Sequence, residues 1–358
     1  MRGAANLQVV VSKILSANVT LENFALREAA VPTATTGAIV VCNYCFTVDP
    51  AIAQRLTHGG DYLTPLGKDV LIPSFNVGHV VETGSPNFAV GDIIVYYGGW
   101  EQFSLLDTAE HGSDPFLFRK IESEGIPLSY HLGVLGNKGF SAFLGIEYLG
   151  GVKSGETVVV SSAAGAVGSF AGQWARQLGA RVIGLTGTSD KIQFLRSEVQ
   201  FDAGLCHRSA DFESRLDEAA PDGIDLYFDN IGGNLQSQIM ERMRPNGRFL
   251  ICGMISEYGE SQPSPGPNLF VTVRRNFKIQ GFLATYYRDK FSEFVSRAKD
   301  LLVRGKLSMR EEAVEGLRQA PAALIGLLGG QNTGQCIVFE REHLDAASVS
   351  IRTKGITL

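Results

Sequence analysis

A short glycine-containing turn, Ala163-Ala164-Gly165-Ala166-Val167-Gly168, combines residue types and spacing that indicate a definite chemistry. It matches the G-x-G-x-x-G pattern that binds the pyrophosphate of a dinucleotide, with Ala163 in place of the first glycine. Gly165 would let the backbone approach the pyrophosphate, and Gly168 would let the following helix pack closely against the preceding strand. We predict that Ala164, Gly165, Ala166, Val167 and Gly168 bind a cofactor, a purely structural turn being the alternative.

The residues on either side of the turn predict the strand and the helix that position such a turn. Thr157–Ser162 is rich in valine and suits a buried parallel strand. Ala166–Leu178 repeats apolar residues at the 3.6-residue spacing of a helix, and Arg181–Thr186 predicts the next strand. The start of that helix would offer unpaired N–H groups and a positive dipole end to phosphate. The order strand, turn, helix, strand favours a nucleotide site.

The end of the second strand indicates which nucleotide is bound. An NAD-specific site carries Asp or Glu there, which bonds the ribose 2′-hydroxyl, whereas this sequence continues Gly187-Thr188-Ser189-Asp190-Lys191. We interpret Thr188, Ser189 and Lys191 as ligands of a 2′-phosphate and predict NADPH as the cofactor. Asp190 opposes this interpretation unless it caps the helix that begins at Lys191, and Lys191 itself could be a solvated helix-start residue.

Two patterns of secondary structure divide the chain. Residues 1–125 read as strands separated by Gly, Pro and Asp, which predicts a β domain. From about Leu132, strands alternate with amphipathic helices, which predicts an α/β Rossmann fold with a doubly wound parallel sheet. A last strand, Gln335–Glu340, would rejoin the β domain and make it discontinuous. The predicted domains are residues 1–130 with 306–358, and the NADPH-binding domain at residues 131–305.

The bulk composition excludes several classes of protein. The 358 residues are 44% hydrophobic with a net charge of −5, which describes a folded chain without a basic surface for nucleic acid. No apolar run is long enough to cross a membrane, and the first residues do not form a signal peptide. Five scattered cysteines do not make a disulfide framework. We expect a cytoplasmic enzyme or binding protein with no membrane or nucleic-acid partner.

Cys42 and Cys45 form a C-x-x-C pair, which in other contexts binds zinc or carries out redox chemistry. A zinc ribbon needs a second pair of ligands, and none follows at a suitable spacing. A redox pair should open a helix, whereas Ile39–Phe46 is typical of a strand. We interpret the two cysteines as ordinary strand residues and predict no metal site.

Taken together, the motifs resemble the zinc-independent branch of the medium-chain dehydrogenase/reductases, which includes leukotriene B4 dehydrogenase/prostaglandin reductases, alkenal double-bond reductases and curcumin reductase. The resemblance runs to about Phe339 and is specific for the branch rather than for one substrate. The stretches that carry it, besides the turn, are Val48-Asp49-Pro50, Gly133-Val134-Leu135-Gly136, residues 155–161, residues 227–233, residues 252–256 and Ile279-Gln280-Gly281-Phe282. Zinc-dependent relatives have a Gly-His-Glu motif, whereas this chain has Gly78-His79-Val80. We therefore expect His79 to be a partly exposed strand histidine and not a zinc ligand.

The resemblance implies a GroES-like β domain beside the Rossmann domain and, commonly, a homodimer. It also implies an activity. Members reduce the C=C bond of α,β-unsaturated aldehydes or ketones with NADPH, by hydride transfer to the β-carbon and protonation of the enolate at the α-carbon. Reduction of a quinone or a carbonyl on the same fold, and NADPH binding without turnover, remain the alternatives.

Site roles follow from the resemblance. Tyr258 would be the catalytic tyrosine, which bonds the substrate carbonyl or relays a proton, with a structural tyrosine as the alternative. Asn230, Phe282, Leu283 and Asn332 would contact the cofactor, Phe282 and Leu283 through backbone groups.

The chain also departs from the family pattern. Ala51 and Phe75 stand where the family has two pocket tyrosines, and Asn137 replaces part of a Met-Pro pair. Tyr286 and Tyr287 are candidate replacements in the substrate pocket. His207 stands for a tyrosine that contacts the 2′-phosphate, and Arg208 beside it could bind that phosphate. The departures predict an atypical substrate; residues 341–358 exceed the usual family end and have no assigned role.

Overall fold

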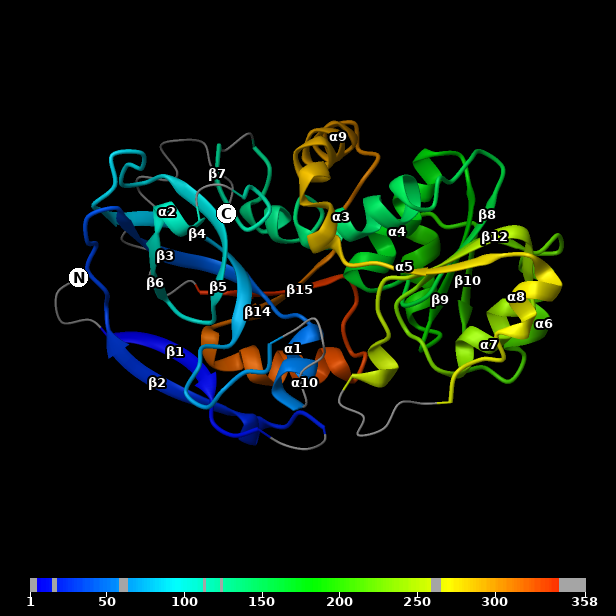
Figure 1. Ribbon diagram of the computed structural model, residues 1–358, viewed down its shortest axis with the longest axis horizontal. Coiled ribbons are helices and arrows are strands. Elements are labelled where there is room, and N and C mark those ends of the chain that lie inside the picture. Colours follow the sequence, from blue (N-terminus) through cyan, green and yellow to red (C-terminus); the bar gives the residue numbers. More distant parts are fainter. Residues whose placement is uncertain are drawn as a thin grey trace. The chain divides into compact units, whose positions relative to one another are not determined.

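A computed structural model describes residues 5–14, 18–57, 64–111, 114–122, 125–258 and 265–340 (Figure 1). The extension at residues 341–358 lies outside them. The chain forms two compact units. The first, the β unit, comprises Met1–Leu132, Glu311–Asn332 and Cys336–Leu358, and the second, the α/β unit, comprises Gly133–Arg310 and Thr333–Gln335. The predicted domain junctions, after residues 130 and 305, lie slightly before the observed changes of unit at Leu132 and Arg310.

The described part of the α/β unit contains a six-stranded sheet in the order β10-β9-β8-β11-β12-β13, with every adjacent pair parallel. In sequence order this is 3-2-1-4-5-6, the order of the dinucleotide-binding doubly wound fold, and it confirms the predicted fold class. The direction of winding changes between β8 and β11, which is where such folds bind ligands. The strands are β8 Thr157–Val160, β9 Arg181–Thr186, β10 Ala203–Cys206, β11 Ile224–Asp229, β12 Met243–Ile251 and β13 Lys278–Gly281.

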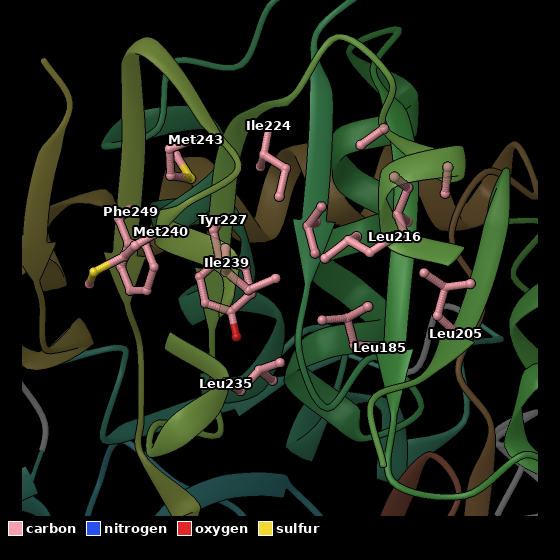
Figure 2. Close-up of a cluster of buried hydrophobic side chains, with 14 of the residues drawn as sticks. Leu185, Leu205, Leu216, Ile224, Tyr227, Leu235, Ile239, Met240, Met243 and Phe249 are labelled. Carbon is pink, nitrogen blue, oxygen red and sulfur yellow. The ribbon is translucent and has the colours of Figure 1, made fainter. Parts of the chain in front are cut away.

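Helices connect these strands because parallel strands need crossovers. One apolar cluster joins strand residues such as Leu185, Tyr227 and Phe249 to helix residues such as Leu216 and Ile239 (Figure 2). A second group of packed aromatic rings joins α3, α4 and α9. The helices of the unit are α3 Asn137–Phe143, α4 Ala166–Gln177, α5 Lys191–Ser197, α6 Phe212–Ala219, α7 Asn234–Met240, α8 Phe270–Arg275 and α9 Phe291–Val303, with short η3 Leu144–Tyr148, η4 Ile255–Glu257 and η5 Ala284–Lys290.

The β unit is built on a sheet in the order β14-β15-β3-β4-β5-β7, with β6 also paired to β3, and a separate β1-β2 pair. The last strand, β15, pairs antiparallel with β3 through Phe339 and Cys45, so the end of the described chain returns to the first part (Figure 1). Its strands are β1 Ala5–Val11, β2 Phe24–Ala30, β3 Ala38–Thr47, β4 Pro73–Thr83, β5 Ile93–Gly99, β6 Phe103–Asp107, β7 Phe118–Ile121, β14 Glu311–Glu315 and β15 Gln335–Phe339; its helices are α1 Ala51–Thr57, α2 Thr108–His111 and α10 Ala320–Leu328, with η1 Leu21–Asn23, η2 Leu128–Leu132 and η6 Leu317–Gln319.

Cys42 and Cys45 lie on β3, as predicted, and both are buried. His79 lies on β4 but is only 7% exposed, so the expectation of a partly exposed histidine was wrong. Its ring stacks on Tyr44, with centroids 5.0 Å apart, and this packing excludes water from it. Across the described ranges, no helix has the length and apolar character required to span a membrane.

Candidate cofactor site

The glycine-containing turn leaves β8 at its carboxyl end. Ser162, rather than a glycine, adopts the left-handed backbone conformation there, with φ of +50°. Ala163 is fully buried and does not share that conformation, which is why an alanine can replace the first glycine of the pattern. Helix α4 begins at Ala166 with Gly165 as its N-cap residue, so its first N–H groups lie at this turn.

The two glycines of the turn have different surroundings. A β-carbon at position 168 would collide with the carbonyl oxygen of Ser162 and lie 2.8 Å from its carbonyl carbon. Glycine is therefore required there for the close approach of α4 to the end of β8. A β-carbon at position 165 would meet only Ser162, at 3.2 Å from its backbone oxygen and its hydroxyl. Gly165 thus leaves space beside the N-terminus of α4.

A second chain segment holds the turn from the other direction. The backbone N–H of Gly334 donates to the carbonyl oxygen of Ala164 over 2.7 Å, and Gly165 and Gly334 form an isolated parallel bridge. Asn332, a predicted cofactor ligand, comes just before this segment in sequence. Its side-chain role is a prediction, whereas the role of Gly334 as a support for the turn was not foreseen.

A buried carboxylate at the end of β11 organises the neighbouring loop. Asp229 is fully buried, and its Oδ1 accepts hydrogen bonds from the Ser161 hydroxyl at 3.0 Å and from the backbone N–H groups of Ile231 and Gly232 at 3.0 and 3.1 Å. Its Oδ2 accepts from the side-chain amide of Gln236 at 2.8 Å. The carboxylate therefore fastens the ends of β8 and β11 together where the winding reverses.

Asn230 also joins the ends of β8 and β11 by hydrogen bonds. Its backbone N–H donates to the Ser161 hydroxyl, and its side-chain amide donates to the Ser161 carbonyl, each over 2.8 Å. Its own carbonyl accepts from the backbone of Ile255 at 3.1 Å. The structure thus gives Asn230 a positioning function at the predicted site. Sequence reasoning assigned no site role to Asp229 or Ser161; a polar residue ending each of two buried strands was the available signal.

Tyr258 is half-buried and directly follows η4. Its hydroxyl lies 3.1 Å from the point that a β-carbon on Gly253 would occupy, so the phenol reaches over the backbone at the end of β12. The Gly253 N–H donates in turn to the carbonyl of Asp229 at 3.1 Å. The structure therefore brings Tyr258 and Asn230 to the same edge of the sheet.

The guanidinium of Arg208 and the imidazole of His207 meet at the ends of β9 and β10. A β-carbon on Gly187 would lie 3.7 Å from the guanidinium carbon of Arg208 and 3.8 Å from Nε2 of His207. Burial, and then the charge of Arg208, lower the pKa of His207 below its usual value. Lys191 is the first residue of α5 and half-buried. Because residue 187 is a glycine, it has no side chain that could compete with a ligand for Arg208 and His207.

The counter-indication, Asp190, is at the N-cap position of α5 but makes no capping hydrogen bond, so the proposed capping role was wrong. Its backbone there is helical, whereas an N-cap residue usually has an extended backbone. A hydrogen bond from Thr188 is the main cause that lowers the pKa of its exposed carboxyl. Thr188 and Ser189 are both exposed.

The remaining predicted residues of the α/β unit are dispersed. The N–H of Phe282 donates to Ile251 within the sheet, so only its other backbone group, the carbonyl, could serve a ligand. The Leu283 carbonyl accepts from Tyr286. Tyr286 is 79% exposed, while Tyr287 packs against Tyr148 with ring centroids 5.8 Å apart. The half-buried Asn137 begins α3.

In the β unit, Ala51 begins α1 and is half-buried. Phe75 on β4 is 8% exposed and packs edge-on against Tyr97 and Phe116. Its backbone N–H donates to the Thr47 hydroxyl at 3.2 Å. Sequence reasoning did not identify Tyr97, because its place beside Phe75 depends on the pairing of β4 with β5.

Comparisons with known proteins agree with this geometry. Residues 166–300 match the family described as zinc-binding dehydrogenase, and residues 8–112 match the N-terminal domain of oxidoreductase. The (+)-pulegone reductase of Mentha piperita is 32% identical over 94% of this chain and 99% of the relative. The NADP(+)-dependent 2-alkenal reductase of Nicotiana tabacum is 34% identical over 84% and 87%, respectively. CurA from Vibrio vulnificus in complex with NADPH superposes with a TM-score of 0.86, at 32% identity over 93% and 98%.

The chain belongs to the medium-chain dehydrogenase/reductases. Within that superfamily its relatives are those of the branch predicted from the sequence, and the predicted resemblance is confirmed. The name of the matched family nevertheless refers to zinc. In this medium-chain dehydrogenase/reductase, the described residues contain no group of three or more His, Cys, Asp or Glu side chains that could hold a metal ion.

Proposed function

We propose that this medium-chain dehydrogenase/reductase uses NADPH to reduce the C=C bond of α,β-unsaturated aldehydes or ketones. The observation that carries the cofactor assignment is the Arg208 guanidinium over Gly187, where an NAD site would have an acidic side chain. The whole-chain similarity to an NADP(+)-dependent 2-alkenal reductase and to (+)-pulegone reductase supports the reaction.

The residues of the site fit a phosphorylated dinucleotide. Gly165 leaves space at the N-terminus of α4, where backbone N–H groups favour pyrophosphate. Arg208, His207 and Lys191 would bind the 2′-phosphate, the guanidinium by charge-assisted hydrogen bonds. The full proposed set is Ala164, Gly165, Ala166, Val167 and Gly168 at the pyrophosphate, Thr188, Ser189, Lys191, His207 and Arg208 at the 2′-phosphate, and Asn230, Phe282, Leu283 and Asn332 toward the nicotinamide.

When bound, NADPH supplies the hydride. The protein must hold the substrate within attack distance and stabilise the negative charge that develops on the carbonyl oxygen. We assign the second function to the Tyr258 hydroxyl, which would donate a hydrogen bond to that oxygen or relay a proton. Two features support this position of the tyrosine. Its hydroxyl lies close to the Gly253 backbone. The backbone N–H groups of Ile255 and Ser256, just before it, donate to the carbonyls of residues 230 and 231.

The proposed substrate-contacting residues are Ala51 and Phe75 in the β unit, and Asn137, Tyr286 and Tyr287 in the α/β unit. Phe75 lies among other aromatic rings, so its surroundings would favour a flat or apolar substrate. The small Ala51 side chain leaves room where the family has a tyrosine. Both features support a bulkier substrate than a short alkenal.

The test is a panel of enals, enones and quinones incubated with NADPH deuterated at the transferred position. Deuterium at the β-carbon of a saturated carbonyl product supports the proposal. A carbinol deuteride or an unlabelled hydroquinone would instead show carbonyl or quinone reduction. Tight NADPH binding without oxidation by any member of the panel would show a binding protein.

We also propose a cytoplasmic homodimer. In this proposal the second copy covers the β13 edge of the sheet. Three exposed apolar side chains lie at α8 and its N-cap residue: Leu269, Phe270 and Val273, exposed by 59%, 62% and 69%. Light scattering should give twice the chain mass, and Val273→Asp should reduce it. The five cysteines are all free thiols, as expected in a reducing compartment.

A further inference from the structure

A tyrosine on β5 lies beside the position where the family's pocket tyrosine is missing. Phe75 and Tyr97 are directly paired across β4 and β5, so their side chains share one face of the sheet. Their ring centroids are 5.0 Å apart at an angle of 61°. Tyr97 is 38% exposed, whereas Phe75 is 8% exposed, so the phenol and not the phenyl ring is accessible.

The Tyr97 hydroxyl is held by a charged partner from α1. Nη1 of Arg55 donates to this hydroxyl over 3.1 Å, and Nε of the same guanidinium donates to the Thr64 carbonyl over 2.8 Å. Arg55 follows Ala51 by four residues on α1, so the two lie on the same face of that helix. Ala51, Phe75 and Tyr97 are therefore parts of one surface of the β unit.

The loop between β3 and α1 is tied to the same surface. The Thr47 hydroxyl donates to Asp49 Oδ2 over 2.8 Å and accepts from the backbone N–H of Phe75 over 3.2 Å. Asp49 precedes α1 by two residues, so these bonds hold the start of the helix next to β4. These hydrogen bonds, with those of Arg55, fix the position of the Tyr97 phenol relative to α1 and β4.

The direction of the Arg55 hydrogen bond leaves the phenol proton available. The guanidinium has only donors, so the Tyr97 oxygen accepts, and none of the described residues accepts the Tyr97 proton in return. Burial raises the pKa of Tyr97, helped by the nearby Asp49 and opposed by Arg55, so the phenol stays protonated at neutral pH. A hydroxyl that accepts from a cation becomes a stronger donor.

We propose that Tyr97, mounted by Arg55, donates the hydrogen bond to the substrate carbonyl that Ala51 and Phe75 cannot provide. This inference rests on the proposed reductase function and names a residue that determines its substrate specificity. The hydroxyl is displaced by one strand from its place in the family, and this displacement would select carbonyl substrates of a different shape. No covalent step is involved.

The test compares Tyr97→Phe with the wild-type protein and with Tyr44→Phe. Tyr44 is a matched control, since its hydroxyl is buried in the same unit, is inaccessible to substrate and has no hydrogen-bond partner among the described residues. Tyr97→Phe should lower kcat/KM for the best enone about 3- to 10-fold. The affinity for NADPH and the thermal midpoint should stay unchanged. Calorimetry of the saturated ketone product with the NADP(+)-loaded protein should show a similar loss of affinity.

The double variant Phe75→Tyr/Tyr97→Phe returns a hydroxyl to the paired strand and should restore at least part of the loss. An unchanged kcat/KM and ketone affinity in Tyr97→Phe would overturn the inference and leave the reductase function standing. An absence of C=C reduction by the wild-type protein would overturn the proposed function and, with it, this inference. If Tyr97→Phe folds poorly, Arg55→Lys provides the second measurement, since it removes the fork that holds the phenol; an unchanged kcat/KM there would also overturn the inference.

Discussion

The guanidinium carbon of Arg208 lies 3.7 Å from the point where a β-carbon on Gly187 would stand. Gly187 follows β9 directly, at the position that distinguishes the two dinucleotides in this fold. An arginine over a glycine reverses the arrangement of an NAD site, in which a carboxylate binds the 2′-hydroxyl. The relationship joins two strands and is consistent with the predicted preference for a 2′-phosphate.

Arg208→Ala should weaken the binding of NADPH about 10- to 100-fold and change that of NADH little, because only the former carries the phosphate. Lys191→Ala should act in the same direction. The measurement is the dissociation constant of each cofactor by fluorescence titration. Arg304→Ala, at the exposed end of α9, is the control. Equal losses for both cofactors would contradict the assignment.

The two glycines of the turn should respond differently to the same substitution. Gly168→Ala places a methyl group against the Ser162 backbone and should lower the free energy of unfolding by about 3 kcal/mol. Gly165→Ala has more room and should cost about 1 kcal/mol or less, yet raise the NADPH dissociation constant at least about 10-fold because the backbone can no longer approach the pyrophosphate. Urea unfolding and cofactor titration on both variants decide the matter. The reverse ranking of stabilities would refute the packing explanation.

Asp229→Asn should destabilise the α/β unit by about 1–3 kcal/mol, since a neutral amide is a weaker acceptor for the hydroxyl and N–H groups that converge on the carboxylate. NADPH affinity should fall as well, because the loop after β11 is no longer held. Denaturant unfolding with and without cofactor measures both effects. Asp217→Asn, in an exposed ion pair with Arg242, should cost under about 1 kcal/mol; a similar cost at both sites would count against a special role for Asp229.

Tyr258→Phe keeps the ring and removes the hydroxyl that lies over Gly253. Turnover of the enone should fall about 100-fold if the phenol serves as general acid or relay, while the dissociation constant of NADPH should change less than about 3-fold. Steady-state kinetics and cofactor titration separate the two. A variant with the wild-type rate would remove Tyr258 from the reaction.

His79→Phe tests a pH-dependent contribution to stability. Burial lowers the pKa of His79 to about 4, below its value in the unfolded chain. The unfolded state therefore takes up a proton as the pH falls below about 6.5 while the folded state does not, so stability decreases toward acid, by about 2 kcal/mol at pH 5. Phe retains the stack on Tyr44 and cannot titrate.

The pH slope of the unfolding free energy between 7 and 5 should therefore be shallower in His79→Phe than in the wild-type protein. Comparing slopes removes any constant difference in packing between the two side chains. Identical slopes would mean that the pKa of His79 is the same in the folded and unfolded states, and would contradict its lowering by burial.

Local pattern was sufficient to predict the elements that carry the nucleotide turn. The range predicted for β9 is the observed one, and α4 and β8 end within two residues of their predicted limits. Elements that depend on their neighbours were not predicted. β10 has four residues, including a glycine, and is defined by its pairing with β9. β14, Glu311–Glu315, is mostly glutamate and exists because β15 pairs with it, against its low strand propensity.

The candidate site shows the same division. Glycine spacing and a missing acidic residue indicated the turn and the nucleotide preference, because both are encoded within a few residues. The supports of the site lie far apart in sequence. Ser161 and Asp229 are 68 residues apart, and Arg55 and Tyr97 are 42 apart. Only the tertiary fold brings such groups within hydrogen-bond distance. A pattern within one short stretch of sequence therefore cannot predict these hydrogen bonds.

The bond from Gly334 to Ala164 has a consequence for modular exchange. The turn at residues 163–168 and its backbone partner belong to one unit but are separated in the gene by more than a helix and a strand of the other unit. A graft of residues 133–310 onto a foreign β domain would move the nucleotide turn without Gly334, whose N–H bonds to the turn. Recombination between relatives at these two junctions would therefore succeed only when the recipient's own final segment can supply the missing N–H. Inheritance of the cofactor site is tied to the far end of the chain.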